Sequence, residues 1–275
     1  DAIVSLLTEK IDDELLDAAG PQLKSVSNVA VGYNNIDVPA CEKRGVLVTN
    51  TPGVLTEATA DIAMSLILMA TRRLGEGERV IRAQEPWQWG MFYMLGMGLQ
   101  GRQLGIVGMG QIGIATARRA KAFGMNIAYT RRSPLEDNVV KELDAKYMSM
   151  DELIESSDVL SLHCPYSPAT HHLMSENQFA RMKKTAFLIN TARGPIVHEQ
   201  ALVDALKSGQ IAGAGLDVFE SEPAVNPGLL ELDNAVLIPH LGSATVETRA
   251  AMADIAATNA LAILAGVQAP NLVTS

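Results

Sequence analysis

Short apolar runs alternate with longer amphipathic stretches along most of the chain. The runs typical of buried parallel strands are residues 3–7, 26–31, 46–49, 104–107, 126–130, 159–163, 186–190, 213–218 and 235–238. Helices are predicted at residues 12–19, 56–73 and 245–265. This alternation predicts an α/β fold whose sheets are parallel and whose helices cover them.

The predicted helix at residues 56–73, with Thr56 as its N-cap, is apolar on nearly every side. Such a helix is usually buried between layers, domains or subunits. Residues 75–103, which contain Trp87 and Trp89, look irregular, and a loop of this length is usually functional or part of an interface. We therefore expect a domain junction in this region.

Composition narrows the class of protein. The chain has 275 residues, which favours about two domains, and a net charge of −9, which argues against nucleic acid or an anionic membrane as the main partner. Its two cysteines form no disulfide framework, and its apolar runs are too short to span a bilayer. We expect a cytoplasmic protein. Because the chain opens without Met on an apolar run, we also expect its N-terminus to be incomplete.

A glycine-rich turn follows the predicted strand at residues 104–107. Gly108, Gly110 and Gly113 have the G-x-G-x-x-G spacing, and an amphipathic helix follows them. In this context the first glycine allows a tight turn, the second lets the backbone approach a pyrophosphate, and the third lets the helix pack closely on the strand. The turn therefore predicts a dinucleotide site at a helix N-terminus.

The end of the next strand indicates which dinucleotide is bound. An NAD site places an acid about 20 residues after the turn, but here Arg131, Arg132 and Ser133 occupy that position. Two guanidinium groups and a hydroxyl suit a 2′-phosphate. We therefore predict NADPH or NADP as the preferred cofactor, with NADH as the alternative.

Three ionisable side chains follow three later strands. Arg193 follows residues 186–190, Glu222 follows residues 213–218, and His240 follows residues 235–238. In an open parallel sheet these strand ends share one edge. There a guanidinium binds an anionic substrate, an imidazole exchanges a proton, and a carboxylate orients that imidazole. The trio predicts an acid–base active site.

The other histidines suggest no further chemistry. We expect His171 and His172 to lie on the surface and His163 and His198 to be structural. The histidines and cysteines have no metal-ligand spacing, so we predict no metal.

Four sets of residues together resemble the D-2-hydroxyacid dehydrogenase family. They are residues 50–61, the turn at 108–113, residues 190–194 with 217–223, and residues 239–243. The resemblance covers essentially the whole chain. Within the family, the chain is most similar to NADPH-linked glyoxylate/hydroxypyruvate reductases, including the type described as 2-ketogluconate reductase.

The resemblance implies two Rossmann-like domains with an active site between them. A flavodoxin-like substrate domain would comprise residues 1–50 and 241–275, and an NAD(P)-binding Rossmann domain residues 51–240. It also implies a homodimer built through residues 56–100, and a small-molecule 2-keto acid as the substrate.

The resemblance further assigns roles to the substrate-binding residues. Arg193 would hold the substrate carboxylate and keto oxygen, His240 would be the acid/base, and Glu222 its partner. The backbone of Val31 and Gly32 would also bind the carboxylate. In addition, we expect Leu55 to help set the substrate size.

The cofactor-binding residues follow in the same way. Besides Arg193 and His240, they are Thr59, Gly108, Met109, Gly110, Gln111, Ile112, Gly113, Arg131, Arg132, Ser133, Cys164, Pro165, Thr191, Ala192, Asp217 and Gly242. Of these, Asp217 would hold the nicotinamide amide.

Two departures and two alternatives accompany this reading. Asn34 follows Tyr33 where the family usually has an acid, and His198 stands where Asp is common. One alternative is a non-catalytic protein that senses dinucleotides on the same fold. The other is an NAD-linked member such as phosphoglycerate dehydrogenase, which Arg131 at the acid position disfavours.

Overall fold

The computed structural model describes residues 1–273 and divides into two compact units. Unit 1 comprises Asp1–Leu55 and the chain from Ser243 on, and unit 2 comprises Thr56–Gly242. The predicted boundaries, after residues 50 and 240, lie close to these divisions. The predicted fold class, an α/β protein with two parallel-sheet domains, is confirmed.

Unit 1 is built on a three-stranded parallel sheet in the order β1-β2-β3 within the described residues. The strands are Ala2–Ser5, Ser25–Asn28 and Leu47–Thr49. Its helices are α1 (Asp13–Ala19), α2 (Val38–Lys43) and α11 (Val246–Leu264). The last of these packs on all three strands.

Local capping explains where these helices begin. The side chain of Asp12 accepts a hydrogen bond from the Leu15 N–H, and Asp37 does the same for Ala40. At α11, Thr245 accepts from the Thr248 N–H. Each of these side chains satisfies a backbone donor that has no partner within its helix, which fixes the first turn.

Unit 2 contains a larger parallel sheet, with seven strands in the described chain in the order β10-β9-β8-β7-β4-β5-β6. These strands are β4 (Gln103–Val107), β5 (Asn126–Thr130), β6 (Lys146–Tyr147), β7 (Val159–Leu162), β8 (Phe187–Asn190), β9 (Gly213–Leu216) and β10 (Ala235–Leu237). The order reverses at β4, where β5 lies on one side and β7 on the other. Ligands of open parallel sheets bind at such a reversal.

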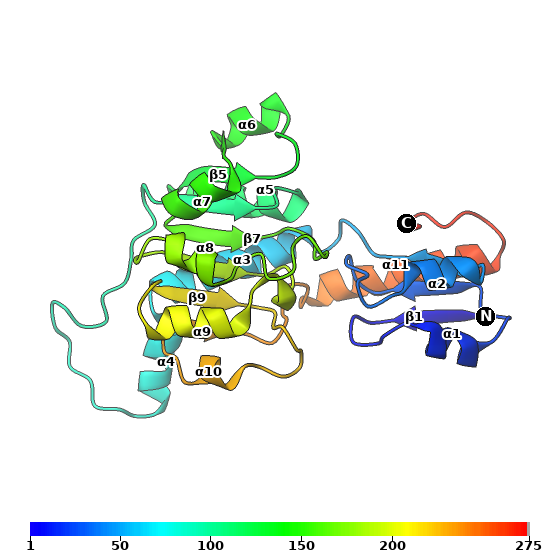
Figure 1. Ribbon diagram of the computed structural model, residues 1–275, viewed down its shortest axis with the longest axis horizontal. Helices are drawn as coiled ribbons and strands as arrows, with labels where there is room; N and C mark the ends of the chain where they lie inside the picture. The colour runs from blue at the N-terminus through cyan, green and yellow to red at the C-terminus, as the bar shows by residue number, and fades with distance from the viewer. Residues whose placement is uncertain (274–275) are drawn as a thin grey trace. The chain divides into compact units, whose positions relative to one another are not determined.

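Helices cover both faces of this sheet (Figure 1). On one face lie α3 (Thr56–Thr71) and α5 (Gln111–Ala122), which contact each other and strands β8, β9, β4 and β5. On the other lie α7 (Met150–Ser156), α8 (Glu176–Arg181) and α9 (Glu199–Lys207). Both faces of the central strands β7, β8 and β9 are therefore buried, which explains their continuous apolar runs.

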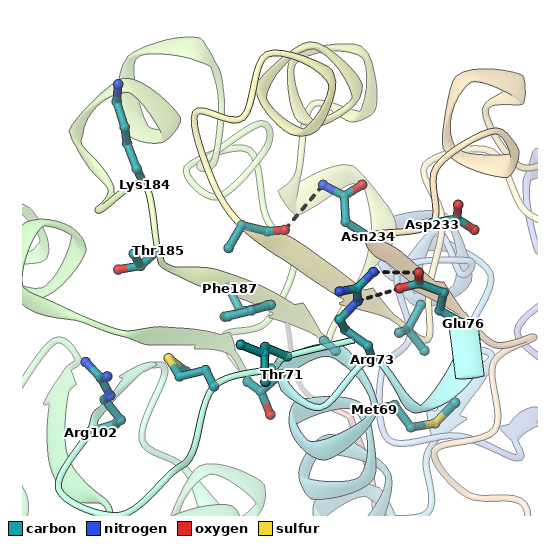
Figure 2. A pocket seen from close by; sticks show the side chains of 16 residues that line it. Met69, Thr71, Arg73, Glu76, Arg102, Lys184, Thr185, Phe187, Asp233 and Asn234 are labelled. Carbon is teal, nitrogen blue, oxygen red and sulfur yellow. Dashed lines mark hydrogen bonds and ion pairs between the residues drawn. The ribbon is translucent and has the colours of Figure 1, made fainter. Parts of the chain in front are cut away.

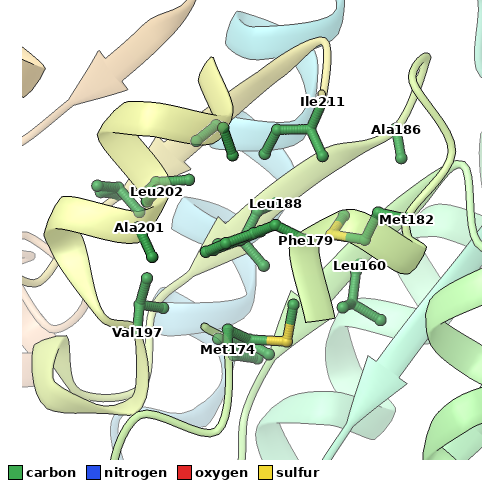
Figure 3. Packing of buried hydrophobic residues seen from close by; sticks show 14 of the residues in the cluster. Leu160, Met174, Phe179, Met182, Ala186, Leu188, Val197, Ala201, Leu202 and Ile211 are labelled. Carbon is green, nitrogen blue, oxygen red and sulfur yellow. The ribbon is translucent and has the colours of Figure 1, made fainter. Parts of the chain in front are cut away.

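The face under α8 and α9 has the more extensive apolar core (Figure 3). Phe179 from α8 and Leu202 from α9 pack over Leu160 and Leu188 of the central strands. All four side chains are at most 1 % exposed, so this face forms a rigid platform beneath the loops that follow the strands.

Several helices differ from the predictions or were not predicted. The predicted irregular region begins with a helix, α4 (Leu74–Arg82), and only then becomes irregular. The short helices α6 (Asp137–Leu143) and α10 (Pro227–Leu230) were not predicted either. Thr56 is the first residue of α3 rather than its N-cap, and its hydroxyl lies 3.4 Å from Gln111 Oε1.

Candidate active site

The glycine-rich turn joins β4 to α5 as the spacing predicts. Gly108 has a φ of 91°, and a methyl group there would lie 2.4 Å from the Cys164 backbone nitrogen. A methyl group on Gly113 would lie 2.8 Å from the Gly108 carbonyl oxygen. Both positions therefore require glycine, one for its conformation and both for space.

Gly110 is different, because a methyl group there would meet no atom within 4 Å. It is also the N-cap of α5, and it has no side chain to bond the first-turn N–H groups. The turn thus presents backbone donors next to open space, which fits the phosphates of a dinucleotide. Met109, Gln111 and Ile112 lie in the same turn and first helical residues.

The arginine pair lies at the end of β5, next to this turn. The guanidinium of Arg131 donates a hydrogen bond to the Met109 carbonyl, 3.2 Å away. Arg131, Arg132 and Ser133 are all exposed. The structure thus brings Arg131 to the turn, while Arg132 and Ser133 have their side chains in solvent.

The loops after β7 and β8 complete the same edge of the sheet. Cys164 follows β7, is buried, and packs against Gly108, as the close approach of its nitrogen shows. Burial raises the pKa of the Cys164 thiol to about 11, so it is an unreactive group. Thr191 and Ala192 follow β8, and the Ala192 N–H donates to Asn190 Oδ1 at 3.0 Å.

Arg193 is partly buried and is held by its neighbours. Its guanidinium donates to the Ala192 carbonyl at 2.7 Å, and its own carbonyl accepts from the Asn190 side chain at 2.9 Å. Burial lowers the pKa of Arg193, and the negative charge of Glu222 opposes this. Asn190 lies in the segment 190–194, but no role was predicted for it from the sequence. It is 1 % exposed, and its side chain fixes this loop.

Glu222 and His240 form a direct pair. Glu222 Oε2 lies 2.8 Å from His240 Nδ1, and each side chain is about one-third exposed. The other oxygen of Glu222 accepts a hydrogen bond from the Phe219 N–H at 2.9 Å. Burial raises the pKa of Glu222, but the hydrogen bonds from His240 and Phe219 outweigh it and lower the pKa below its usual value. The carboxylate therefore stays charged beside the imidazole.

The backbone around His240 is held in an unusual conformation. His240 has a φ of 52°, a conformation that costs a non-glycine residue about 1–3 kcal/mol. Its N–H donates to the Asp217 carbonyl at 2.9 Å. With Nδ1 bound to Glu222, Nε2 is the nitrogen that this arrangement directs to a reacting group.

Asp217 binds the backbone of the loop that carries His240. Its carboxylate accepts hydrogen bonds from the N–H groups of Leu241 and Gly242, the second at 2.8 Å. Burial raises the pKa of Asp217, and these two hydrogen bonds oppose the shift. Thr59, at the start of α3, donates its hydroxyl to the Gly242 carbonyl at 3.1 Å. Both residues therefore shape the loop that carries His240.

Within unit 2, the glycine-rich turn, Arg131, Arg193, Asp217, Glu222 and His240 all lie at the end of a strand on one edge of the sheet, whereas Arg132 and Ser133 have exposed side chains. Val31, Gly32 and Leu55 belong to unit 1. Within that unit, the carbonyls of Val31 and Gly32 accept hydrogen bonds from Asn50 and Asn28 at 2.8 and 2.9 Å. Asparagine side chains thus fix the turn after β2.

One expectation about the histidines was wrong. His172 is partly buried rather than on the surface, and its Nε2 lies 2.6 Å from Glu220 Oε1. The partners are 48 residues apart in sequence, so no local pattern could have shown the pair. His163 bonds Ser161 Oγ at 2.8 Å. Within residues 1–273, no group of three or more His, Cys, Asp or Glu side chains is placed to hold a metal ion.

A separate cavity of about 560 Å³ opens at the amino ends of the strands (Figure 2). Arg102, Phe187 and Asn234 line it, each at or just before the start of a strand. Because Arg193, Glu222 and His240 follow carboxyl ends, this cavity is not part of their site.

No helix in the described part of the chain is both long and apolar enough to cross a membrane.

Comparisons with known proteins agree with this geometry. Residues 64–242 match the model of the D-isomer specific 2-hydroxyacid dehydrogenase, NAD binding domain. A glyoxylate reductase from Korarchaeum cryptofilum is 52% identical over 276 residues, covering 99% of this chain and 82% of that protein.

Two solved structures are similar over nearly the whole chain. A glyoxylate reductase from Paecilomyes thermophila has a TM-score of 0.90 at 41% identity, covering 99% of this chain and 83% of that one. An NADPH-dependent glyoxylate/hydroxypyruvate reductase from Sinorhizobium meliloti, solved with NADP and malonate, has a TM-score of 0.89 at 38% identity and covers 100% and 84%. The chain is therefore an NAD(P)-dependent oxidoreductase that belongs to the D-isomer specific 2-hydroxyacid dehydrogenase family.

Proposed function

We propose that the chain catalyses the NADPH-dependent reduction of short 2-keto acids, foremost glyoxylate and hydroxypyruvate, to D-2-hydroxy acids. The observation that carries the proposal is the Glu222–His240 pair, at 2.8 Å, on the same sheet edge as Arg193 and the glycine-rich turn. Similarity to reductases of glyoxylate and hydroxypyruvate supports the substrate class. 2-Ketogluconate is a further candidate substrate.

The cofactor would be held by the turn between β4 and α5. The first-turn N–H groups of α5 would bind the pyrophosphate, and Arg131 the 2′-phosphate of NADPH. The bound dinucleotide supplies a hydride to the substrate carbon. The absence of an acid at the end of β5 supports NADPH over NADH.

The protein's own side chains would bind the keto acid and supply the proton. Arg193 offers a planar fork of donors that matches a carboxylate and the adjacent keto oxygen. His240, protonated on both nitrogens, gives the Nε2 proton to the carbonyl oxygen and keeps the Nδ1 proton bonded to Glu222. We propose that the backbone N–H groups of Val31 and Gly32 also bind the carboxylate. We further propose that Leu55 helps to set substrate size.

We also propose a homodimer formed through residues 56–100. Trp89, Met91 and Phe92 are 78%, 73% and 83% exposed, and they lie close together in sequence. Figure 1 shows the chain after α4 extending away from the sheet of unit 2. Large apolar side chains grouped on an extended loop favour a protein interface. A cytoplasmic location remains a prediction.

Removal of His240 tests the proposed chemistry. We expect His240→Ala to lower kcat with glyoxylate by about a hundredfold or more, the usual contribution of a general acid. NADPH affinity, measured by fluorescence titration, should fall by no more than about tenfold, because the turn that would bind the phosphates is intact and only one predicted cofactor contact is lost. Lys141→Ala, which removes an exposed cation from the last turn of α6, is the control. Near-normal turnover of His240→Ala would contradict the assignment of His240 as the proton donor.

A further inference from the structure

A group of ionisable side chains, centred on Glu220, adjoins the segment that carries Glu222. Glu220 is two residues before Glu222, in the segment that follows β9. Both of its carboxylate oxygens have partners: Oε1 lies 2.6 Å from His172 Nε2, and Oε2 accepts from the Glu199 N–H at 3.1 Å. The segment that carries Glu222 is thus anchored through Glu220.

Glu199 returns the same kind of bond. The Glu220 N–H donates to Glu199 Oε1 at 2.6 Å, so each glutamate binds the backbone of the other. Glu199 is the first residue of α9 and is only 6% exposed. A buried carboxylate with such a partner resists displacement, because loss of one bond leaves a buried polar group unsatisfied.

The same two segments touch at a second point. A methyl group on Gly194 would lie 1.8 Å from the Phe219 carbonyl oxygen and 2.4 Å from the Glu220 nitrogen. Gly194 directly follows Arg193, and Phe219 donates its N–H to Glu222. The backbone that carries Arg193 therefore lies directly against the backbone that carries Glu222, and the Glu199–Glu220 bonds join the two segments five residues further along.

His172 adds a third segment to this group. Its N–H donates to the Pro195 carbonyl at 2.8 Å, while its ring binds Glu220. The ring also lies 4.6 Å from the His198 ring. The loop before α8 thus contacts both the Arg193 segment and the Glu222 segment.

We propose that Glu199 and Glu220, supported by His172, are positioning residues that fix Glu222 against His240 and fix the Arg193 segment relative to both. The hydrogen bonds of Glu199 and Glu220 go to each other's backbone, and His172 bonds Glu220 and the backbone of Pro195, so the three act on the site through the backbone segments that they join. The inference rests on the proposed function for its kinetic consequence, but its geometric consequence is independent of turnover.

The test compares two substitutions at one position. Glu199→Ala removes the acceptor for the Glu220 N–H, whereas Glu199→Gln keeps an oxygen there. We expect Glu199→Ala to lower kcat by about tenfold or more, because a shift of the backbone that carries Glu222 misplaces the catalytic pair relative to the substrate. NADPH affinity should stay within about threefold of the wild type. Glu199→Gln should restore kcat to within about threefold. Asp204→Ala, which removes an exposed carboxylate from the same helix, is the matched control.

A second readout follows the Glu222–His240 hydrogen bond itself. In protein labelled with ¹⁵N-histidine, the bonded Nδ1 proton of His240 should give a low-field NMR signal that is absent from His240→Asn. We expect this signal to shift or broaden in Glu199→Ala and to be retained in Glu199→Gln and Asp204→Ala. A purely stabilising role would lower the melting temperature and leave the signal unchanged.

A further variant covers the case in which Glu199→Ala does not fold. His172→Asn removes the partner of Glu220 and keeps a residue that tolerates the φ of 48° at this position. We expect a loss of kcat of about threefold to tenfold and a shifted His240 signal.

The outcomes separate the two claims. If the wild type turns over keto acids and the Glu199→Ala and His172→Asn variants match it in kcat and in the His240 signal, the inference is overturned and the proposed function stands. An equal loss in Glu199→Ala and Glu199→Gln also overturns it. If the wild type is inactive with every keto acid while the signal responds as expected, the positioning role stands and the proposed function fails.

Discussion

At the scale of single residues, the three glycines of the turn after β4 have different requirements. Gly108 needs its positive φ and the space beside Cys164, and Gly113 needs the space above the Gly108 carbonyl. Gly110 meets no protein atom within 4 Å, so the folded chain alone does not require a glycine there. The requirement at Gly110 would come from the bound dinucleotide.

This difference predicts that alanine at Gly110 weakens cofactor binding, whereas alanine at Gly108 lowers stability. Gly110→Ala should change the free energy of unfolding by no more than about 1 kcal/mol, yet weaken NADPH binding by about tenfold or more, because the methyl group occupies the path of the pyrophosphate. Gly108→Ala should destabilise the protein by about 2 kcal/mol or more through its φ and its contact with Cys164. Chemical denaturation and NADPH titration measure both. Unchanged NADPH affinity in Gly110→Ala would contradict the cofactor site.

His163 gives a prediction for pH. Burial lowers the pKa of His163 to about 4, from its usual value of 6.5. Between these values the unfolded chain binds more protons than the folded chain, so this group lowers stability as the pH falls through that window, by at most about 3 kcal/mol. His163→Gln removes the titration. The stability of the wild type relative to His163→Gln should therefore decrease between about pH 7 and about pH 4. Urea unfolding of both proteins measures this, and parallel pH profiles would show that His163 is not held neutral.

At the scale of elements, the loops after β8 and β9 must fit together without a side chain between them. Gly194→Ala would place a methyl group about 2 Å from the backbone of Phe219 and Glu220, and backbone atoms cannot rotate away as a flexible side chain can. We expect the free energy of unfolding to fall by about 2 kcal/mol or more. We also expect kcat to fall by about tenfold or more, because the two loops carry Arg193 and Glu222. Gly98→Ala, whose methyl group meets nothing within 4 Å, is the control. A fully active Gly194→Ala would contradict the close approach of the two loops.

The strands and the principal site residues were predictable because they leave local signals. A strand buried on both faces reads as a continuous apolar run, and residues that follow parallel strands share one edge by topology. Helix α4 was not predictable, because Gly75 and Gly77 lower its helix propensity and Leu74 and Ile81 remain exposed.

The supports of the site left no such signal. Asp217 binds the backbone of Leu241 and Gly242, and His172 binds Glu220. These contacts depend on how distant segments meet, and any acid or histidine on the surface looks the same in sequence. Sequence reasoning therefore placed Arg193, Glu222 and His240 at one sheet edge and named Asp217 as a cofactor contact. It did not foresee that Asp217 also binds the loop that carries His240, and it missed the pairing of His172 with Glu220.

At the scale of the whole molecule, the proposed dimer can be tested through its exposed loop. Trp89→Ser together with Phe92→Ser removes two large side chains that are 78% and 83% exposed. We expect this variant to elute as a monomer while the wild type elutes as a dimer, because the interface loses much of its apolar area. Light scattering coupled to size-exclusion chromatography measures the mass. A monomeric wild type, or a variant that remains dimeric, would contradict the proposed interface.

The most direct test of the central claim is the loss of reduced-nicotinamide absorbance catalysed by the wild-type protein. NADPH and NADH are each compared against glyoxylate, hydroxypyruvate and 2-ketogluconate. The account predicts turnover with the short keto acids and a higher kcat/KM with NADPH than with NADH, since Arg131 stands where an NAD site has an acid. Tight NADPH binding without turnover of any keto acid would contradict it and would favour a protein that senses the dinucleotide.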